Sequence, residues 1–201
     1  MSARWPFSNG TPGIAISISK RMRIAILSDI HDNLWNLSSA LTTLRDSDAL
    51  ICCGDLCSPF VVDELTKFER DVHIVFGNND ADLYRITAKA LKKANCHVHG
   101  ELFESEFDGK RIIANHFDYL ARPMSRSGDY DVVCFGHNHE LEISREGRCL
   151  LINPGPIMGA KFSSGRWEDT AATFVIYETG GDTAKVFGID RESKAVRELR
   201  S

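Results

Sequence analysis

The sequence has no apolar run near the ~20 residues needed to span a bilayer, which argues against an integral membrane protein. It also has no internal repeat and no low-complexity tract. Positive charge is not in excess, because 24 Lys and Arg are outnumbered by 28 Asp and Glu, which gives a formal net charge of -4. The chain therefore offers no extended nucleic-acid surface, since such a surface requires an excess of positive charge.

Cysteine pairs at zinc-site spacing are also missing. Of the six cysteines, Cys52 and Cys53 are adjacent in an apolar run, and Cys134 lies in another, where cysteine acts as a small hydrophobe. Cys53 and Cys57 have no partner pair, so the spacing indicates neither a structural zinc nor a disulfide framework. Unpaired thiols favour a reducing compartment, and we predict a cytoplasmic protein.

The amino terminus lacks the arrangement of a secretory signal. Residues 14–18 form a weak apolar patch, but Lys20 and Arg21 follow this patch instead of preceding it. We therefore interpret residues 1–21 as a non-core N-terminal extension, with Met22 as the original start of the protein.

What the sequence does contain is typical of one globular domain. Of its 201 residues, 43% are hydrophobic and 26% are charged, and this length is too short for two ordinary domains. We assign residues 22–190 to a single domain and residues 191–201 to a charged tail, which we expect to fray.

Strands and helices alternate in the first half of the chain. Apolar runs at residues 24–27, 49–53 and 72–76 each precede a polar turn and a helical pattern, which predicts a largely parallel sheet. After Gly100 the chain becomes rich in strands. The strands expected there cover residues 102–107, 111–114, 132–135, 141–144, 149–152, 172–177 and 184–189, with a helix over 118–127. We expect an α/β (α+β) fold of two packed mixed β-sheets sandwiched between helices.

Polar side chains recur where these apolar runs end. They are Asp29, His31, Asp55, Asn78, His116, His137 and His139. The carboxyl ends of parallel strands converge on one crevice, where open α/β sheets bind ligands. Imidazole, carboxylate and amide donors form a borderline-hard set that suits Mn, Fe, Zn or Ni better than Ca. The residues therefore indicate a transition-metal site, and their order and placement argue against the alternative of ordinary turn residues.

The local chain around these residues supports the same interpretation. Gly54 and Gly77 each precede a proposed ligand directly, which allows a sharp turn and a close approach of the backbone to an ion. His137 and His139 would point to opposite faces of a regular strand, so they reach a common ion only where the backbone is irregular.

The motifs that carry these residues resemble those of the calcineurin-like metallophosphoesterase superfamily, particularly its small bacterial and archaeal phosphodiesterases. The matching segments are Asp29-Ile30-His31, Gly54-Asp55, Gly77-Asn78-Asn79-Asp80, His116, Gly136-His137-Asn138-His139 and Asn153-Pro154-Gly155. The resemblance covers residues 22–190 and implies the four-layer fold of that superfamily, which agrees with the two sheets and outer helices expected above.

The resemblance further implies two divalent transition-metal ions, with Mn favoured and Fe, Zn or Ni as alternatives. The residues implied for the first ion are Asp29, His31 and His139. Those implied for the second are Asn78, His116 and His137, and Asp55 would bridge both ions. A hydroxide between the ions would attack phosphorus in line, because metal binding makes water acidic enough to supply hydroxide near neutral pH. The implied substrate is a small phosphoester, either a diester or a nucleotide.

Two departures from the family pattern bear on catalysis. Many members have a histidine after the ligand asparagine, where it protonates the leaving oxygen, but this chain has Asn79. An amide is no general acid at ordinary pH, which favours the phosphodiesterase type. His116 follows Ala114-Asn115 instead of the usual segment.

We name Asn79 and Asp80 as catalytic candidates. Asp80 would orient Asn79 or a ligand histidine, or would cap a helix.

Two other functions stay open beside the phosphodiesterase. A phosphomonoesterase acting on nucleotides or proteins would use the same site. A non-catalytic scaffold would share the fold, as one retromer subunit does, but such relatives typically lose ligands, and here all the ligand positions hold competent side chains. The oligomeric state is also open, and a homo-oligomer is compatible with the sequence.

Specificity would come from the loops around the crevice. Residues 156–171 are one candidate, because they are rich in Gly, Ser and charge. Arg122 and Arg126 could reach a second phosphate group or lie as exposed helix charges. Trp35 and Phe117 could stack on a base or pack in the core.

Overall fold

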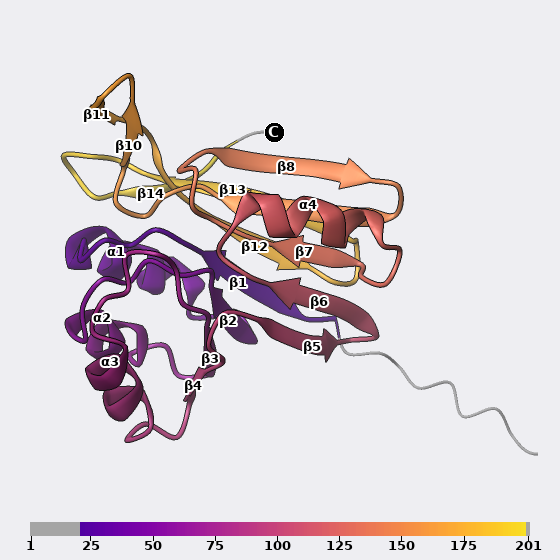
Figure 1. Cartoon of the computed structure of the whole chain (residues 1–201), viewed down its shortest axis with the longest axis horizontal. Coiled ribbons are helices and arrows are strands. Elements are labelled where there is room, and N and C mark those ends of the chain that lie inside the picture. Colours follow the sequence, from indigo (N-terminus) through magenta and orange to yellow (C-terminus); the bar gives the residue numbers. More distant parts are fainter. Residues whose placement is uncertain (1–20, 200–201) are drawn as a thin grey trace, which may run out of the picture.

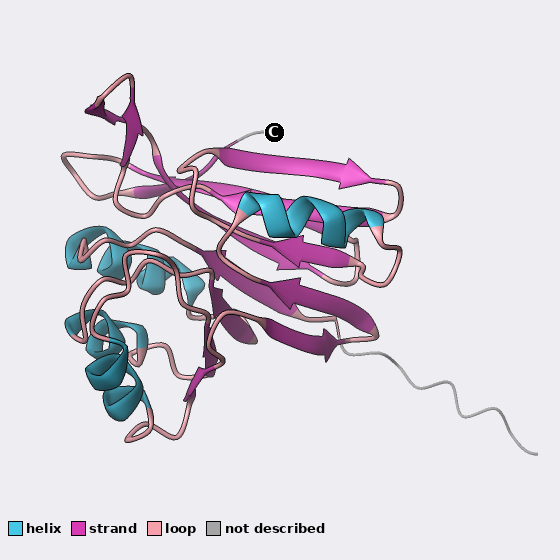
Figure 2. Ribbon diagram, viewed as in Figure 1, coloured by secondary structure: helices cyan, strands magenta, loops and turns pink. Residues whose placement is uncertain are grey.

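Two β-sheets pack face to face between helices in the computed structural model, which describes residues 21–199 (Figures 1 and 2). The extension that we assign to residues 1–21 therefore lies outside the described residues, apart from its last residue. Within the described range no helix is long and apolar enough to cross a membrane.

The larger sheet in residues 21–199 has seven strands in the order β14-β13-β12-β1-β2-β3-β4. Its parallel strands are β1 (Arg23–Leu27), β2 (Ala49–Cys52), β3 (Asp71–Ile74) and β4 (Cys96–Val98). The helices between them are α1 (Leu34–Leu44), α2 (Phe60–Leu65) and α3 (Leu83–Ala90). The antiparallel strands are β12 (Ala172–Glu178), β13 (Thr183–Ile189) and β14 (Val196–Leu199).

The smaller sheet of the described chain has five strands in the order β5-β6-β7-β9-β8. These are β5 (Phe103–Phe107), β6 (Lys110–Ala114), β7 (Val132–Cys134), β8 (Leu141–Glu146) and β9 (Cys149–Pro154), with helix α4 (Asp118–Arg126) against them. The hairpin of β10 (Ala160–Ser163) and β11 (Arg166–Asp169) stands apart from both sheets in Figure 1.

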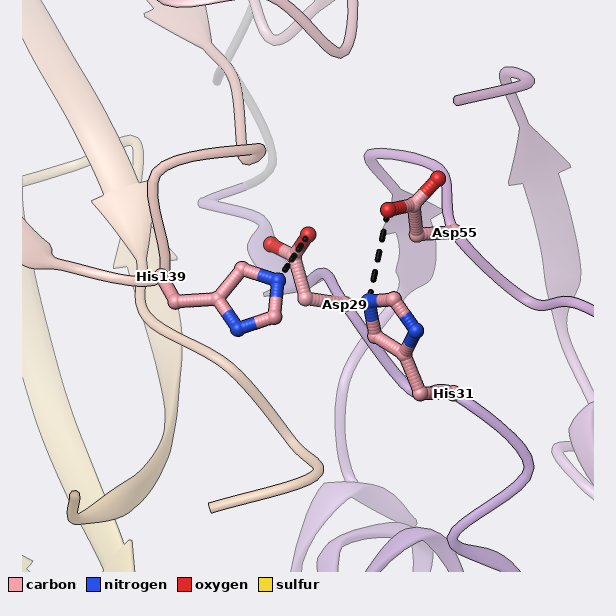
Figure 3. A group of neighbouring side chains, drawn as sticks. All are labelled: Asp29, His31, Asp55 and His139. Carbon is pink, nitrogen blue, oxygen red and sulfur yellow. Dashed lines mark ion pairs between the residues drawn. The ribbon is translucent and has the colours of Figure 1, made fainter. Parts of the chain in front are cut away.

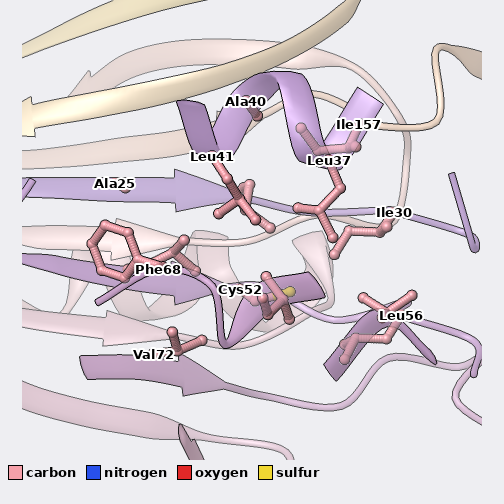
Figure 4. Close-up of a cluster of buried hydrophobic side chains, with 14 of the residues drawn as sticks. Ala25, Ile30, Leu37, Ala40, Leu41, Cys52, Leu56, Phe68, Val72 and Ile157 are labelled. Atoms are coloured by element: carbon pink, nitrogen blue, oxygen red, sulfur yellow. The ribbon is translucent and has the colours of Figure 1, made fainter. Parts of the chain in front are cut away.

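Alternation along the strands explains the layers. In β1, Ala25 and Leu27 belong to the cluster that contains the residues of α1 and α2, and Figure 4 shows Ala25 near Leu37, Ala40 and Leu41 of α1. Ile24 and Ile26 pack toward the smaller sheet. In β6, Ile112 faces the larger sheet and its neighbour Ile113 belongs to the cluster under α4. Because successive side chains of a strand point to opposite faces, strands covered on both faces must be apolar throughout.

The predicted fold class is confirmed, and so are most of the expected elements. The prediction that the chain frays after Ile189 is wrong for residues 196–199, because these residues form β14 and pair with β13. The charged side chains of this strand obscured its pattern, since an edge strand needs few buried residues. Strands β4, β10 and β11 also went unpredicted.

Candidate metal centre

Four predicted ligands meet at the carboxyl ends of the strands (Figure 3). Asp29 and His31 follow β1, Asp55 follows β2, and His139 lies between β7 and β8. One ligand atom of each lies within 4.8 Å of those of the others. The Nε2 atom of His31 is 3.3 Å from Oδ2 of Asp55, and Nε2 of His139 is 3.3 Å from Oδ1 of Asp29.

The other three predicted ligands form a second group that shares Asp55. The amide oxygen Oδ1 of Asn78 lies 2.8 Å from Nδ1 of His137 and 3.1 Å from Nε2 of His116. The same His116 atom is 3.4 Å from Oδ2 of Asp55. One carboxylate oxygen therefore faces both His31 and His116, so the structure brings all the predicted ligands together.

The backbone is irregular at these positions. The φ angles are 51° at Asp29, 44° at His31, 56° at Asp55, 77° at His137 and 57° at His139. Non-glycine residues rarely adopt this left-handed region, and those that do cluster at functional sites. The irregular backbone lets His137 and His139 turn toward one cluster, which a regular strand would prevent.

Backbone carbonyls fix the tautomers of two histidines. The Nδ1–H of His116 donates to the carbonyl of Cys53 at 2.7 Å, and that of His139 donates to Ala160 at 2.6 Å. A carbonyl can only accept, so Nδ1 must carry the proton. In the neutral ring the lone pair is then on Nε2, which faces the carboxylates, and this arrangement is typical of histidines that bind metals.

The residues present fit divalent cations of the transition series. Nε2 of His31 is buried without a hydrogen-bond partner among the described residues, although it faces Asp55. A buried nitrogen left in this way is costly unless something binds it. Together with the two buried carboxylates Asp29 and Asp55, it makes a donor set of imidazole and carboxylate that suits such an ion.

Electrostatics keep the carboxylate of Asp55 charged. Burial raises its pKa, but the neighbouring imidazoles of His116 and His31 outweigh burial and hold the pKa well below its usual range. Burial lowers the pKa of His116, but its contact with Asp55 outweighs burial and raises the pKa above its ordinary value. The pKa of His139 is raised in the same way by its contact with Asp29. The anionic form, which metal binding requires, is therefore the stable form of Asp55.

Asn79 and Asp80 support the site in ways that differ from our expectation. The backbone N–H and the Nδ2 of Asn79 donate to the two oxygens of Asp55, both at 2.8 Å. The sequence predicts that Asp80 orients Asn79 or a ligand histidine, but Asp80 accepts hydrogen bonds from the backbone N–H groups of Gly77, Asp55 and Cys57. It is not the helix cap either, because Asp82 caps α3.

The structure also locates the other residues that the sequence analysis considered for the site. Asn153 is fully buried and donates to the carbonyl of Gly136 and to Asn138, so it ties β9 to the loop of His137. Arg122 and Arg126 form ion pairs with Glu142 and Glu146 of β8. Phe117 lies edge-on against the rings of His116 and His137, and Trp35 is 74% exposed on α1.

A hollow of about 330 Å³ opens over the cluster. The residues that line it are His31, Asn78, Asn79, His137, Asn138, His139, Phe162 and Trp167. Sequence reasoning singled out residues 156–171 as a specificity loop but missed Phe162 and Trp167. An aromatic pair facing across a short hairpin turn at Ser164-Gly165 was the available signal.

Close packing at Gly136 leads to a prediction. A Cβ atom there would lie 1.9 Å from Oγ of Ser28 and 2.7 Å from Oδ2 of Asp29. Gly136→Ala should therefore displace β1 and Asp29, and we expect it to lower the free energy of unfolding by roughly 1–3 kcal/mol, measured by denaturant titration. Gly181→Ala is the matched control, since its nearest neighbour would be the side chain of Thr183 at 3.2 Å. Equal stability of the two variants would contradict the packing argument.

The fold and this site together define the class of metal-dependent phosphoric ester hydrolases. The chain belongs to the calcineurin-like phosphoesterase superfamily, because the family model for that domain matches residues 22–182. The class of enzyme and the family that the motifs predict are thereby confirmed.

Individual relatives support the same assignment. Phosphodiesterase MJ0936 of Methanocaldococcus jannaschii is 29% identical over 184 residues, which cover 89% of this chain and 98% of that protein. The solved structure of an archaeal phosphodiesterase gives a TM-score of 0.67 at 29% identity, with 89% of this chain and 99% of that chain covered. Vacuolar protein sorting 29 from Cryptosporidium parvum has a TM-score of 0.66 at 20% identity, with 90% and 97% covered, which shows a shared fold.

Proposed function

We propose that this protein is a cytoplasmic phosphodiesterase that works with two divalent metal ions, preferably Mn²⁺. Asp29, His31 and His139, whose ligand atoms lie close together, would hold the first ion. Asn78, His116 and His137 would hold the second, and Asp55 would be shared by both ions. Bound ions of this kind lower the pKa of water, supply hydroxide near neutral pH for in-line attack on phosphorus, and neutralise charge on the phosphoryl oxygens.

The residues that line the hollow are the main reason to propose a phosphodiester substrate instead of a phosphomonoester. Among the described residues, its lining contains no Lys or Arg, and its only ionisable side chains are the proposed ligands His31, His137 and His139. A phosphomonoester carries about -1.5 to -2 charge at pH 7, whereas a diester carries a single negative charge. With no side-chain cation to meet the second charge, the hollow favours the diester.

The contacts of Asn79 support the same choice. Its side chain donates to Asp55, so it steadies the bridging carboxylate and offers no proton to a leaving group. Esters whose leaving group departs without protonation are therefore the better substrates. The relative named as a phosphodiesterase agrees with this chemistry.

A comparison of two substrates with one leaving group tests the proposal. We expect the metal-loaded protein to hydrolyse bis-p-nitrophenyl phosphate with a kcat/KM at least about tenfold above that for p-nitrophenyl phosphate, a difference of roughly 1.4 kcal/mol. Release of p-nitrophenolate measures both reactions. Faster turnover of the monoester would establish the phosphomonoesterase instead, and turnover of neither would favour the scaffold.

A further inference from the structure

Two aromatic side chains stand beside the proposed ligands on the β10–β11 hairpin. The ring centroid of Trp167 lies 6.4 Å from that of His31 and 5.9 Å from that of His139. The ring of Phe162 lies 5.6 Å from Trp167, and both line the hollow. Yet Trp167 is 56% exposed and Phe162 is 62% exposed, so the core of the protein does not account for them.

The hairpin fixes the direction of this aromatic pair. Phe162 and Trp167 are directly opposite in the antiparallel register, which places them on one face. The turn residues Ser164 and Gly165 have φ of 53° and 80°, as a two-residue type I′ turn requires, and such a turn sets the register.

Contacts with the ligand loop anchor the hairpin to the site. The carbonyl of Ala160 accepts the hydrogen bond from His139, and Nζ of Lys161 lies 3.0 Å from Oε1 of Glu140. The same strand therefore orients a ligand and carries Phe162. Strand β10 therefore links the aromatic face to the predicted ligand His139.

The geometry of attack decides which part of a substrate meets Trp167. In phosphoryl transfer the attacking and leaving oxygens lie roughly in line on opposite sides of phosphorus. If the attacking hydroxide is held at the ligand cluster, as the proposed function requires, the leaving group would point out of the hollow. The ester group that stays on phosphorus would then lie to the side, and Trp167 stands on one such side, next to His31 and His139.

We propose that Trp167, with Phe162 beside it, is the specificity-determining surface of the site and stacks on a planar aromatic ring of the retained ester group. The inference rests on the proposed function and narrows its substrate class to phosphodiesters that carry a nucleobase or another aromatic ring. Stacking is open to any planar ring, since it uses the face of the ring and not its hydrogen-bonding edge.

Three diesters that share the p-nitrophenolate leaving group test the inference. They retain a methyl, a phenyl or a thymidine 5′-yl group. For the metal-loaded wild type we expect kcat/KM of each aromatic diester to exceed that of the methyl diester by about tenfold, the range found for stacking on an aromatic side chain. In Trp167→Ala this ratio should fall to about one, and in Trp167→Phe most of it should remain.

Equilibrium binding gives a second readout that does not depend on turnover. By calorimetry, phenyl phosphate should bind the metal-loaded wild type about tenfold more tightly than methyl phosphate, and Trp167→Ala should remove the difference. Trp35→Ala is the matched control, since this exposed tryptophan of α1 does not line the hollow, and it should keep both ratios.

The outcomes separate this inference from the proposed function. If the wild type hydrolyses all three diesters with equal kcat/KM and binds both monoesters equally, the aromatic site is overturned and the phosphodiesterase stands. If it hydrolyses none of them, the proposed function fails. If kcat/KM for the thymidine diester exceeds that for the phenyl diester, the ring that stacks is a nucleobase. If both exceed the methyl diester by the same factor, the site accepts aromatic rings in general.

Discussion

Asp55→Asn is expected to lower kcat for bis-p-nitrophenyl phosphate by roughly three orders of magnitude, which corresponds to about 4 kcal/mol of transition-state stabilisation. Oδ2 of Asp55 faces both His31 and His116, so this one carboxylate serves both halves of the site. An amide removes the negative charge that would bridge two cations. In either orientation it also sets an NH₂ group against a donor of Asn79, which is either the backbone N–H or the Nδ2 group.

The fold should survive this change. The backbone N–H of Asp55 is held by Asp80, and that contact is independent of the Asp55 side chain. Circular dichroism and thermal unfolding check the fold, and elemental analysis should show fewer than two metal ions per chain. Asp63→Asn is the control, because Asp63 is an exposed carboxylate of α2 paired with Lys89, and it should leave kcat unchanged. A kcat of Asp55→Asn within threefold of wild type would remove Asp55 from the proposed mechanism.

Removal of metal ions should abolish turnover and lower the melting temperature. Without cations, the buried carboxylates Asp29 and Asp55 lie beside His31, whose Nε2 has no hydrogen-bond partner in the described chain. Ligands that bind only the folded state stabilise it by about 4 kcal/mol at a thousandfold excess over Kd. The measurement is dialysis against a chelator, followed by differential scanning calorimetry and the diester assay.

Re-addition of single metals completes this experiment. Mn²⁺ should restore both turnover and melting temperature, with Fe²⁺, Zn²⁺ and Ni²⁺ as alternatives, because the carboxylates of the site suit Mn²⁺ and its imidazole nitrogens suit the other three ions. Ca²⁺ should restore neither, since it prefers a shell of oxygen ligands. Full activity in a sample shown by elemental analysis to be free of metal would refute the metal-dependent mechanism.

Local signals in the sequence were sufficient for the strands and helices that form the core. The run at residues 24–27 is apolar on both faces because β1 lies between the helices and the second sheet. The helix after Asn33 follows from its cap and its repeat of leucines, and the structure places α1 there. Short strands with few buried side chains, such as β10 and β14, carry no such signal, because their pairing partners determine them.

The sequence by itself determined which side chains are the predicted ligands, because each of them follows an apolar run, and ligand sites form where parallel strands end. Only the tertiary structure decided how they meet. It turned His137 and His139 toward one cluster through left-handed backbone angles, and it gave His116 and His139 carbonyl partners from distant segments. It also placed Trp167 beside the predicted ligands His31 and His139. These contacts join residues far apart in the chain, and their geometry depends on the packing of two sheets, which no local pattern encodes.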